Sequence, residues 1–127
     1  GIDAGRQAAE HLAQQSVDLL RVRVTAVGGI SHVLKIVRAA EAFGVNCELD
    51  PDDGYGGFAS AALMGACRNA MLFYWTPGEQ GNLVRGADGL ISQRLSVQDG
   101  HVSLGSEAGV GLQLDWKRIE ENAEQVL

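Results

Sequence analysis

The chain has 127 residues, of which 46% are hydrophobic and 20% charged, a composition that fits one globular domain and excludes a disordered chain. Sixteen acidic residues against ten basic ones give a formal net charge of −6, the wrong sign for binding nucleic-acid phosphates. No apolar run approaches the roughly 18 residues of a membrane span, and no signal peptide is recognisable. Cys47 and Cys67 lie in apolar stretches and are expected to be free thiols. We therefore expect a cytoplasmic protein that binds neither nucleic acid nor membrane.

The first half of the chain alternates between helix and strand patterns. Apolar residues at helical spacing predict a helix over 4–15, and the β-branched run VDLLRVRV predicts a strand over 17–24. After Gly28-Gly29, an apolar stripe predicts a second helix that begins at Ile30 and ends at Gly44. Further strands are predicted over 45–49 and 71–75, with a helix of small residues over 58–67 between them. This alternation is typical of βαβ units with a parallel sheet, and so of the α/β class.

The pattern changes after residue 75. Apolar residues alternate over 94–104 around Asp99-Gly100, a dipeptide that favours a type I′ hairpin turn. Asp115 is the predicted N-cap of a final helix, whose apolar positions are Trp116, Ile119, Ala123 and Val126.

The glycine-rich segment DPDDGYGG precedes the small-residue helix and has two interpretations. Gly56 and Gly57 can present backbone N–H groups to an anion at the helix start, or they can serve the turn alone. A calcium loop is excluded, because the twelfth position from Asp50 is Ala61 and not the required glutamate. The three histidines have no carboxylate or cysteine at metal-ligand spacing, so we expect no metal site from them.

Charged residues alternate along two of the predicted strands. Because side chains alternate between the faces of a strand, Arg21 and Arg23 share one face, as do Glu48 and Asp50. If the two strands are parallel neighbours, these faces lie side by side. Four charges on one inward face are costly unless they are paired. The residues alone fit structural ion pairs and a polar active-site floor equally well.

Three segments carry a family resemblance, namely VDLLRVRVTAVGGISHVLKIVRAAEAFGVNCELD (17–50), RNAMLFYW (68–75) and DGHVSLGSEAGVGLQLDWKRIEEN (99–122). They resemble the sixth strand with its Gly-Gly-Ile turn and helix, the seventh and eighth strands, and the C-terminal tail of the mandelate racemase and muconate lactonizing enzyme group of the enolase superfamily. The resemblance implies the C-terminal portion of a (β/α)7β barrel. Residues 1–76 would form the partial barrel and residues 77–127 a hairpin and helix tail. A closed barrel takes about 250 residues, so we expect this chain to be part of one.

The resemblance also implies chemistry. Members of the group bind Mg²⁺ through carboxylates on the third to fifth strands and abstract the proton α to a substrate carboxylate. Counting back from the Gly-Gly-Ile turn places the last of these ligands at or before Gly1, so the Mg²⁺ ligands and the second-strand lysine base are expected upstream. The implied partners are a small carboxylate substrate and the N-terminal barrel and cap segment. A further copy of the chain is also expected, because a short parallel sheet leaves unpaired edges.

Three family positions hold unexpected residues. The sixth-strand Asp falls on Arg23, the seventh-strand His on Asp50, and the eighth-strand Glu on Tyr74. Arginine does not give up its proton, and a carboxylate stabilised by a neighbouring guanidinium accepts a proton poorly. We therefore predict an ion pair between Arg23 and Asp50 in place of the family's second base. Alternatively, the planar fork of Arg23 binds a substrate carboxylate.

The remaining site residues are assigned to substrate binding. Arg21 and Glu48 are expected to pair below the first ion pair, and Gly56 and Gly57 to face an anionic group. The resulting hypothesis is a segment of an enzyme that acts on an acid-sugar-like carboxylate by Mg²⁺-assisted dehydration or racemisation. The alternative is a catalytically silent relative or partner subunit held together by structural ion pairs. A weaker alternative is a free-standing domain that completes its sheet with another copy.

Overall fold

The computed structural model describes residues 2–50, 55–73, 90–91, 95 and 97–123. Its elements in chain order are α1 (Ile2–Ala13), β1 (Leu19–Arg23), α2 (Val24–Val27), α3 (Ile30–Ala42), β2 (Asn46–Asp50), α4 (Tyr55–Ala66), β3 (Ala70–Phe73), β4 (Val97–Gln98), β5 (His101–Val102) and α5 (Trp116–Asn122). No helix in these described ranges is long and apolar enough to cross a membrane.

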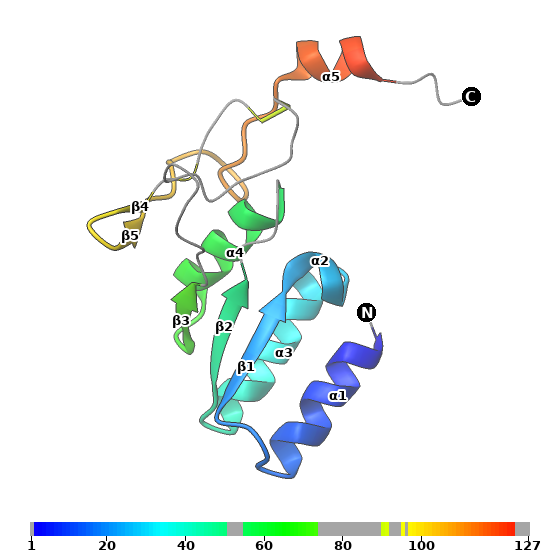
Figure 1. The fold of residues 1–127 in the computed structure, drawn as a ribbon, viewed down its shortest axis with the longest axis vertical. Coiled ribbons are helices and arrows are strands. Elements are labelled where there is room, and N and C mark those ends of the chain that lie inside the picture. Colours follow the sequence, from blue (N-terminus) through cyan, green and yellow to red (C-terminus); the bar gives the residue numbers. More distant parts are fainter. Residues whose placement is uncertain (1, 51–54, 74–89, 92–94, 96, 124–127) are drawn as a thin grey trace.

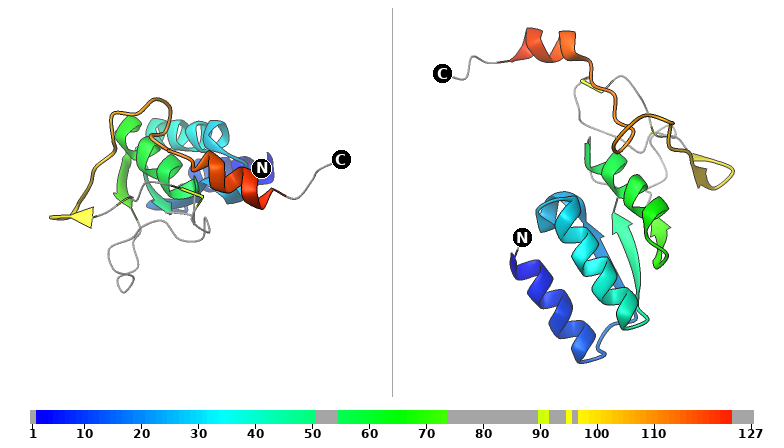
Figure 2. Two further views of the ribbon diagram at one scale, coloured as in Figure 1. Left: turned by 90° about the horizontal axis from the view of Figure 1, so that it is seen from above. Right: turned by 180° about the vertical axis from the view of Figure 1, so that it is seen from behind.

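The centre of the fold is a parallel three-stranded sheet. Its strand order is β1-β2-β3, which is also the order in the chain (Figure 1). Helix α3 follows β1 and helix α4 follows β2, and both helices pack on the same face of the sheet (Figure 2). The predicted βαβ organisation is confirmed.

The main core lies between the sheet and its helices. Fully buried side chains come from α1, α3 and β2, namely Leu12, Val33, Val37, Cys47 and Leu49. Ala59 and Leu63 of α4 and Ala70 of β3 belong to the same cluster. Since burial of apolar area is the dominant favourable term in folding, this cluster fixes how the helices sit on the sheet.

The Gly-Gly-Ile turn connects β1 to α3. The predicted strand over 17–24 is shorter in the structure, because Val24 begins the one-turn helix α2 that sequence reasoning missed. Gly28 and Gly29 both have positive φ, 93° and 105°, which few L side chains adopt without strain. They end α2 and start α3, and Gly44 with φ 71° follows the end of α3 as predicted.

Helix α4 begins earlier than predicted. Its first residues are Tyr55, Gly56 and Gly57, so the two glycines lie buried in the helix and not in a preceding loop. Strand β3 starts one residue before the predicted boundary, at Ala70. Tyr74, which the sequence placed at the end of this strand, lies outside the described residues.

The C-terminal region forms a short hairpin and a helix. Asp99 and Gly100, with φ 50° and 78°, connect β4 to β5 and confirm the predicted type I′ turn. The Asp115 side chain accepts a hydrogen bond from the N–H of Arg118 at 3.1 Å, which confirms it as the N-cap of α5. Ala123 is the C-cap and lies just outside the helix, contrary to the prediction, while Val126 is outside the described residues.

A second apolar cluster joins this tail to α4. Phe58, Ala61 and Leu95 are buried at its centre, and partly buried residues of the tail pack around them. The tail therefore holds the first two turns of α4.

Candidate functional site

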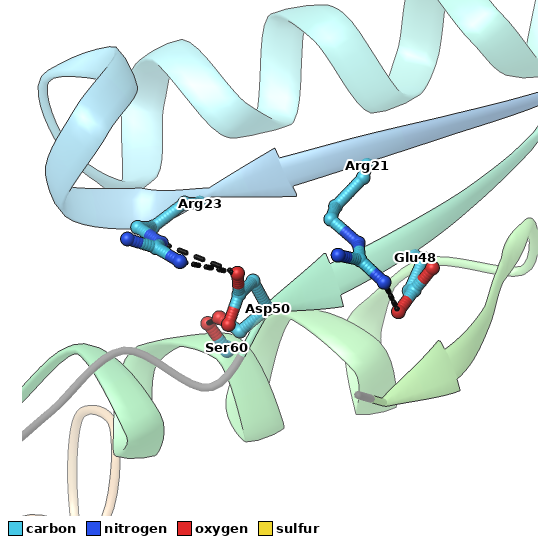
Figure 3. Close-up of polar contacts among 5 residues, drawn as sticks. All are labelled: Arg21, Arg23, Glu48, Asp50 and Ser60. Carbon is cyan, nitrogen blue, oxygen red and sulfur yellow. Dashed lines mark hydrogen bonds and ion pairs between the residues drawn. The ribbon is translucent and has the colours of Figure 1, made fainter. Parts of the chain in front are cut away.

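Two neighbouring strands bring four charged side chains together. The parallel register of β1 and β2 places Arg21 opposite Glu48 and Arg23 opposite Asp50. Alternation along each strand then directs these side chains away from Cys47 and Leu49, which belong to the core packed against the helices. Figure 3 shows the four as two successive rungs, here called the upper pair (Arg23–Asp50) and the lower pair (Arg21–Glu48).

The upper pair lies at the carboxyl ends of the two strands. Arg23 donates to one oxygen of Asp50 twice, from Nη2 at 2.7 Å and from Nε at 3.2 Å (Figure 3). The Asp50 side chain is 10% exposed and that of Arg23 is 54% exposed. The carboxylate is thus enclosed, while much of the arginine reaches water.

The lower pair lies two residues earlier on the same strands. Nη2 of Arg21 donates to Oε1 of Glu48 at 3.0 Å. Glu48 is as enclosed as Asp50, and Arg21 as exposed as Arg23. Glu48 has strand neighbours on both sides, Arg21 in β1 and Leu72 in β3, so its backbone is held within the sheet. The predicted pairing of both rungs is confirmed.

The arrangement limits what this group of residues can do chemically. Burying a carboxylate away from water is unfavourable unless charged donors replace its hydration, and each arginine supplies such a donor. A guanidinium keeps its proton, so neither arginine is a general base. Arg23 instead places a planar cation, half open to solvent, at the carboxyl end of the sheet, where α/β folds bind ligands.

Ser60 contacts the upper pair through the backbone. Its side chain is completely buried in α4, and its hydroxyl donates to the Asp50 carbonyl oxygen at 2.9 Å (Figure 3). Sequence reasoning missed this residue, because one serine in a run of small helical residues gives no signal. Gly56 and Gly57, predicted to bind an anion, are buried one turn before it.

The described residues do not fit a magnesium site. Mg²⁺ prefers several oxygen ligands in octahedral geometry, and no group of three or more His, Cys, Asp or Glu gathers within the ranges that the structure describes. Glu48 and Asp50 each already accept from an arginine.

The two cysteines lie away from the charged rungs. Both are free thiols, with Cys47 buried in β2 and Cys67 partly exposed after α4. Burial, together with a smaller effect of the neighbouring Cys67, raises the pKa of the Cys47 thiol from 9.0 to about 11. Burial also raises the pKa of Cys67. Neither thiol is therefore an activated nucleophile near neutral pH.

Comparison with known proteins identifies similar structures and the family of this chain. One structure with a similar fold is a substrate-liganded complex of the L-Ala-D/L-Glu epimerase from Bacillus subtilis, at 28% identity and a TM-score of 0.69 over 85% of this chain. A muconate lactonizing enzyme is similar over 94% of the chain, with 19% identity and a TM-score of 0.71. An enolase from Pantoea ananatis with bound D-gluconate and magnesium matches 88% of the chain, with 19% identity and a TM-score of 0.69.

The chain covers only part of each of these structures. It spans 29% of the epimerase, 33% of the muconate lactonizing enzyme and 26% of the gluconate-bound enolase. The comparison with curated proteins found no match. The family profile described as enolase C-terminal domain-like matches residues 4–118, nearly the whole chain. With its parallel βα units and that match, the chain belongs to the enolase C-terminal domain-like family, as a portion of its barrel.

Proposed function

We propose that the complete protein is an enolase-superfamily enzyme that removes the proton α to the carboxylate of an acid-sugar-like substrate, in a dehydration or a racemisation. One observation carries the proposal: a chain of this family presents Arg23 at the carboxyl ends of its strands, where barrel enzymes hold their substrates. The similar structures include an epimerase and an enolase with bound D-gluconate, which is a sugar acid.

In this proposal Arg23 binds the substrate carboxylate. Its guanidinium can present two parallel N–H donors to a carboxylate, a geometry that lysine lacks. Asp50 holds the arginine in place and does not take the proton. The lower pair supports the upper one from within the sheet. Gly56, Gly57 and Tyr74 stay predicted contributors to substrate binding and catalysis.

The base and the metal would come from elsewhere in the protein. The family resemblance implies that Mg²⁺ and the lysine base come from barrel strands that precede these. An enolase of similar fold was crystallised with magnesium. The proposed domain division is a barrel portion over 1–76 and a tail over 77–127. The proposed partners of this chain are the cap and the earlier barrel strands. Assembly into an oligomer is proposed as well.

A second candidate function is a silent relative or partner subunit. The observation that favours it is the pairing itself: both enclosed carboxylates accept from arginines, so neither is poised as a base. The upstream sequence discriminates between the two functions. Three intact metal-binding carboxylates and a second-strand lysine favour the enzyme, and their loss favours the silent form.

The test is exchange of the substrate α-proton with solvent. The purified full-length protein is incubated in D2O with Mg²⁺ and a panel of sugar acids, and deuterium incorporation is followed by NMR. We expect incorporation with at least one acid, and Asp50→Asn is expected to retain it within about tenfold, with Glu48→Gln as the matched control. Complete loss in a folded Asp50→Asn variant would overturn the proposed role of Asp50. No exchange with any acid would favour the silent form.

A further inference from the structure

The end of β2 carries the carboxylate of the upper pair. Asp50 is the last residue of the strand, whereas Glu48 lies inside it with strand partners on both sides. A residue inside a sheet is oriented by its ladder, but the direction of a chain leaving a strand depends on additional contacts. The Asp50 carboxylate therefore needs something beyond the β1–β2 register to meet Arg23.

Ser60 supplies that contact. In a helix interior, serine usually bonds to the carbonyl of its own preceding turn or to water. Here its hydroxyl instead leaves α4 and donates to the backbone carbonyl of Asp50 at 2.9 Å. Because the Ser60 side chain is 0% exposed, no water can take over this bond without a rearrangement.

The bond fixes Asp50 at its main chain and leaves its carboxylate to Arg23. The same residue thus accepts from Ser60 through its carbonyl and from Arg23 through Oδ2 (Figure 3). A two-point hold of this kind sets both the position of the strand end and the direction of the side chain. The lower pair has no contact with Ser60 among the hydrogen bonds that the structure describes.

We propose that Ser60 is a positioning residue for the Arg23–Asp50 pair: its buried hydroxyl aligns the end of β2 so that the Asp50 carboxylate holds the Arg23 guanidinium toward the ligand. The placement of Asp50 against Arg23 stands on geometry, whereas the ligand and the consequence for turnover rest on the proposed function. Since a small misplacement of a positioning group slows catalysis, loss of the hydroxyl should act through Arg23.

The test compares Ser60→Ala with Leu63→Val in the full-length protein. Leu63 is buried one turn further along α4, so its truncation loosens the same helix without touching Asp50. Exchange of the guanidinium protons of Arg23 and Arg21 is measured by ¹⁵N NMR, with the signals assigned from Arg23→Lys and Arg21→Lys. Ser60→Cys, which keeps the size and a weak donor, serves as the conservative variant.

We expect Ser60→Ala to speed exchange at Arg23 at least tenfold, to leave Arg21 within about twofold, and Ser60→Cys to give an intermediate rate. Leu63→Val should lower the melting temperature without changing the ratio between the two arginines. Unchanged Arg23 exchange in Ser60→Ala, equal acceleration at both arginines, or the same selective effect in Leu63→Val would each overturn the proposal.

Turnover separates this proposal from the proposed function. Where the wild-type protein exchanges a substrate α-proton, Ser60→Ala should raise the substrate KM at least fivefold, in parallel with the Arg23 signal. If Ser60→Ala speeds guanidinium exchange at Arg23 alone, and the wild-type protein exchanges no substrate α-proton, Ser60 remains a positioning residue and the proposed function is overturned. Reduced turnover with an unchanged Arg23 signal would overturn the role of Ser60 alone.

Discussion

Strand β2 buries its two faces by different means. On one face Cys47 and Leu49 are 0% exposed and pack with the helices in the main apolar cluster. On the other, Glu48 and Asp50 are nearly as enclosed, yet they are charged and paired with arginines of β1. In a barrel, the helix-covered face is the outer one and the opposite face lines the interior. The outer face therefore stabilises the unit through apolar packing, whereas the inner face encloses two carboxylates that each accept from an arginine.

The largest effect should come from the apolar face. Leu49→Ala removes a fully buried side chain and leaves a cavity, so we expect the free energy of unfolding to fall by about 3 kcal/mol. Urea unfolding measures the change. In the folded variant, KM for the substrate should match the wild type, because the charged face is untouched. A KM change comparable to that of an arginine variant would erase the functional difference between the faces.

The next largest effect should come from the arginines. Arg23→Met and Arg21→Met each leave an enclosed carboxylate without its charged donor, so we expect a loss of about 2 kcal/mol in either case. Only Arg23→Met should also raise the substrate KM, by at least tenfold, because Arg23 is the one of these two arginines that is proposed to bind the ligand. Steady-state kinetics checks this, and equal KM values in the two variants would contradict the division of labour between the rungs.

Cys47 gives the apolar face a pH dependence. Its thiol has a pKa of about 11 in the folded protein against 9.0 without burial, so the unfolded chain loses the proton first. Stability from this group is therefore full below pH 9 and falls as the pH rises toward 11. At pH 10 we expect a loss of roughly 1 kcal/mol, and Cys47→Ala should flatten the slope. Denaturation curves between pH 8 and 10.5 measure it, and an equally steep slope in Cys47→Ala would contradict the burial of this thiol.

The smallest effect should come from ion pairs outside the sheet. Arg6 and Glu10 of α1 lie 3.4 Å apart, and Lys117 and Glu121 of α5 lie 3.9 Å apart, all on exposed side chains. Water and salt screen such pairs, so Arg6→Ala and Lys117→Ala should change stability by no more than about 0.5 kcal/mol. A loss as large as that of Arg21→Met, measured by the same unfolding assay, would show that enclosure of the carboxylate is not what distinguishes the rungs.

Local patterns in the sequence predicted much of this molecule. The period of two in LRVR and CELD, with parallel strands from βαβ units, predicted both rungs, because register and alternation decide which residues lie opposite each other. The Asp99-Gly100 turn and the Asp115 cap were predictable because each depends on neighbouring residues only.

Features that depend on tertiary contacts were not predictable. Helix α2 begins inside a β-branched run, where local propensity favours a strand, and the burial of Val24 and Val27 in the main core outweighs that preference. Helix α4 starts through two glycines, which are poor helix formers, and packing against the sheet and tail outweighs that preference. The bond from Ser60 to Asp50 joins residues ten positions apart in two different elements, and no spacing rule indicates it.

The two rungs also decide how β1 and β2 can align. Sliding one strand by a single residue would turn the arginines toward the apolar face, beside Cys47 and Leu49. Sliding by two residues would keep the faces but match only one arginine with one carboxylate, and the other two charges would lose their strand partners. Each wrong alignment would therefore leave an enclosed charged side chain without its strand partner. The two ion pairs therefore favour one register, so the four charged residues also disfavour misassembly while the sheet forms.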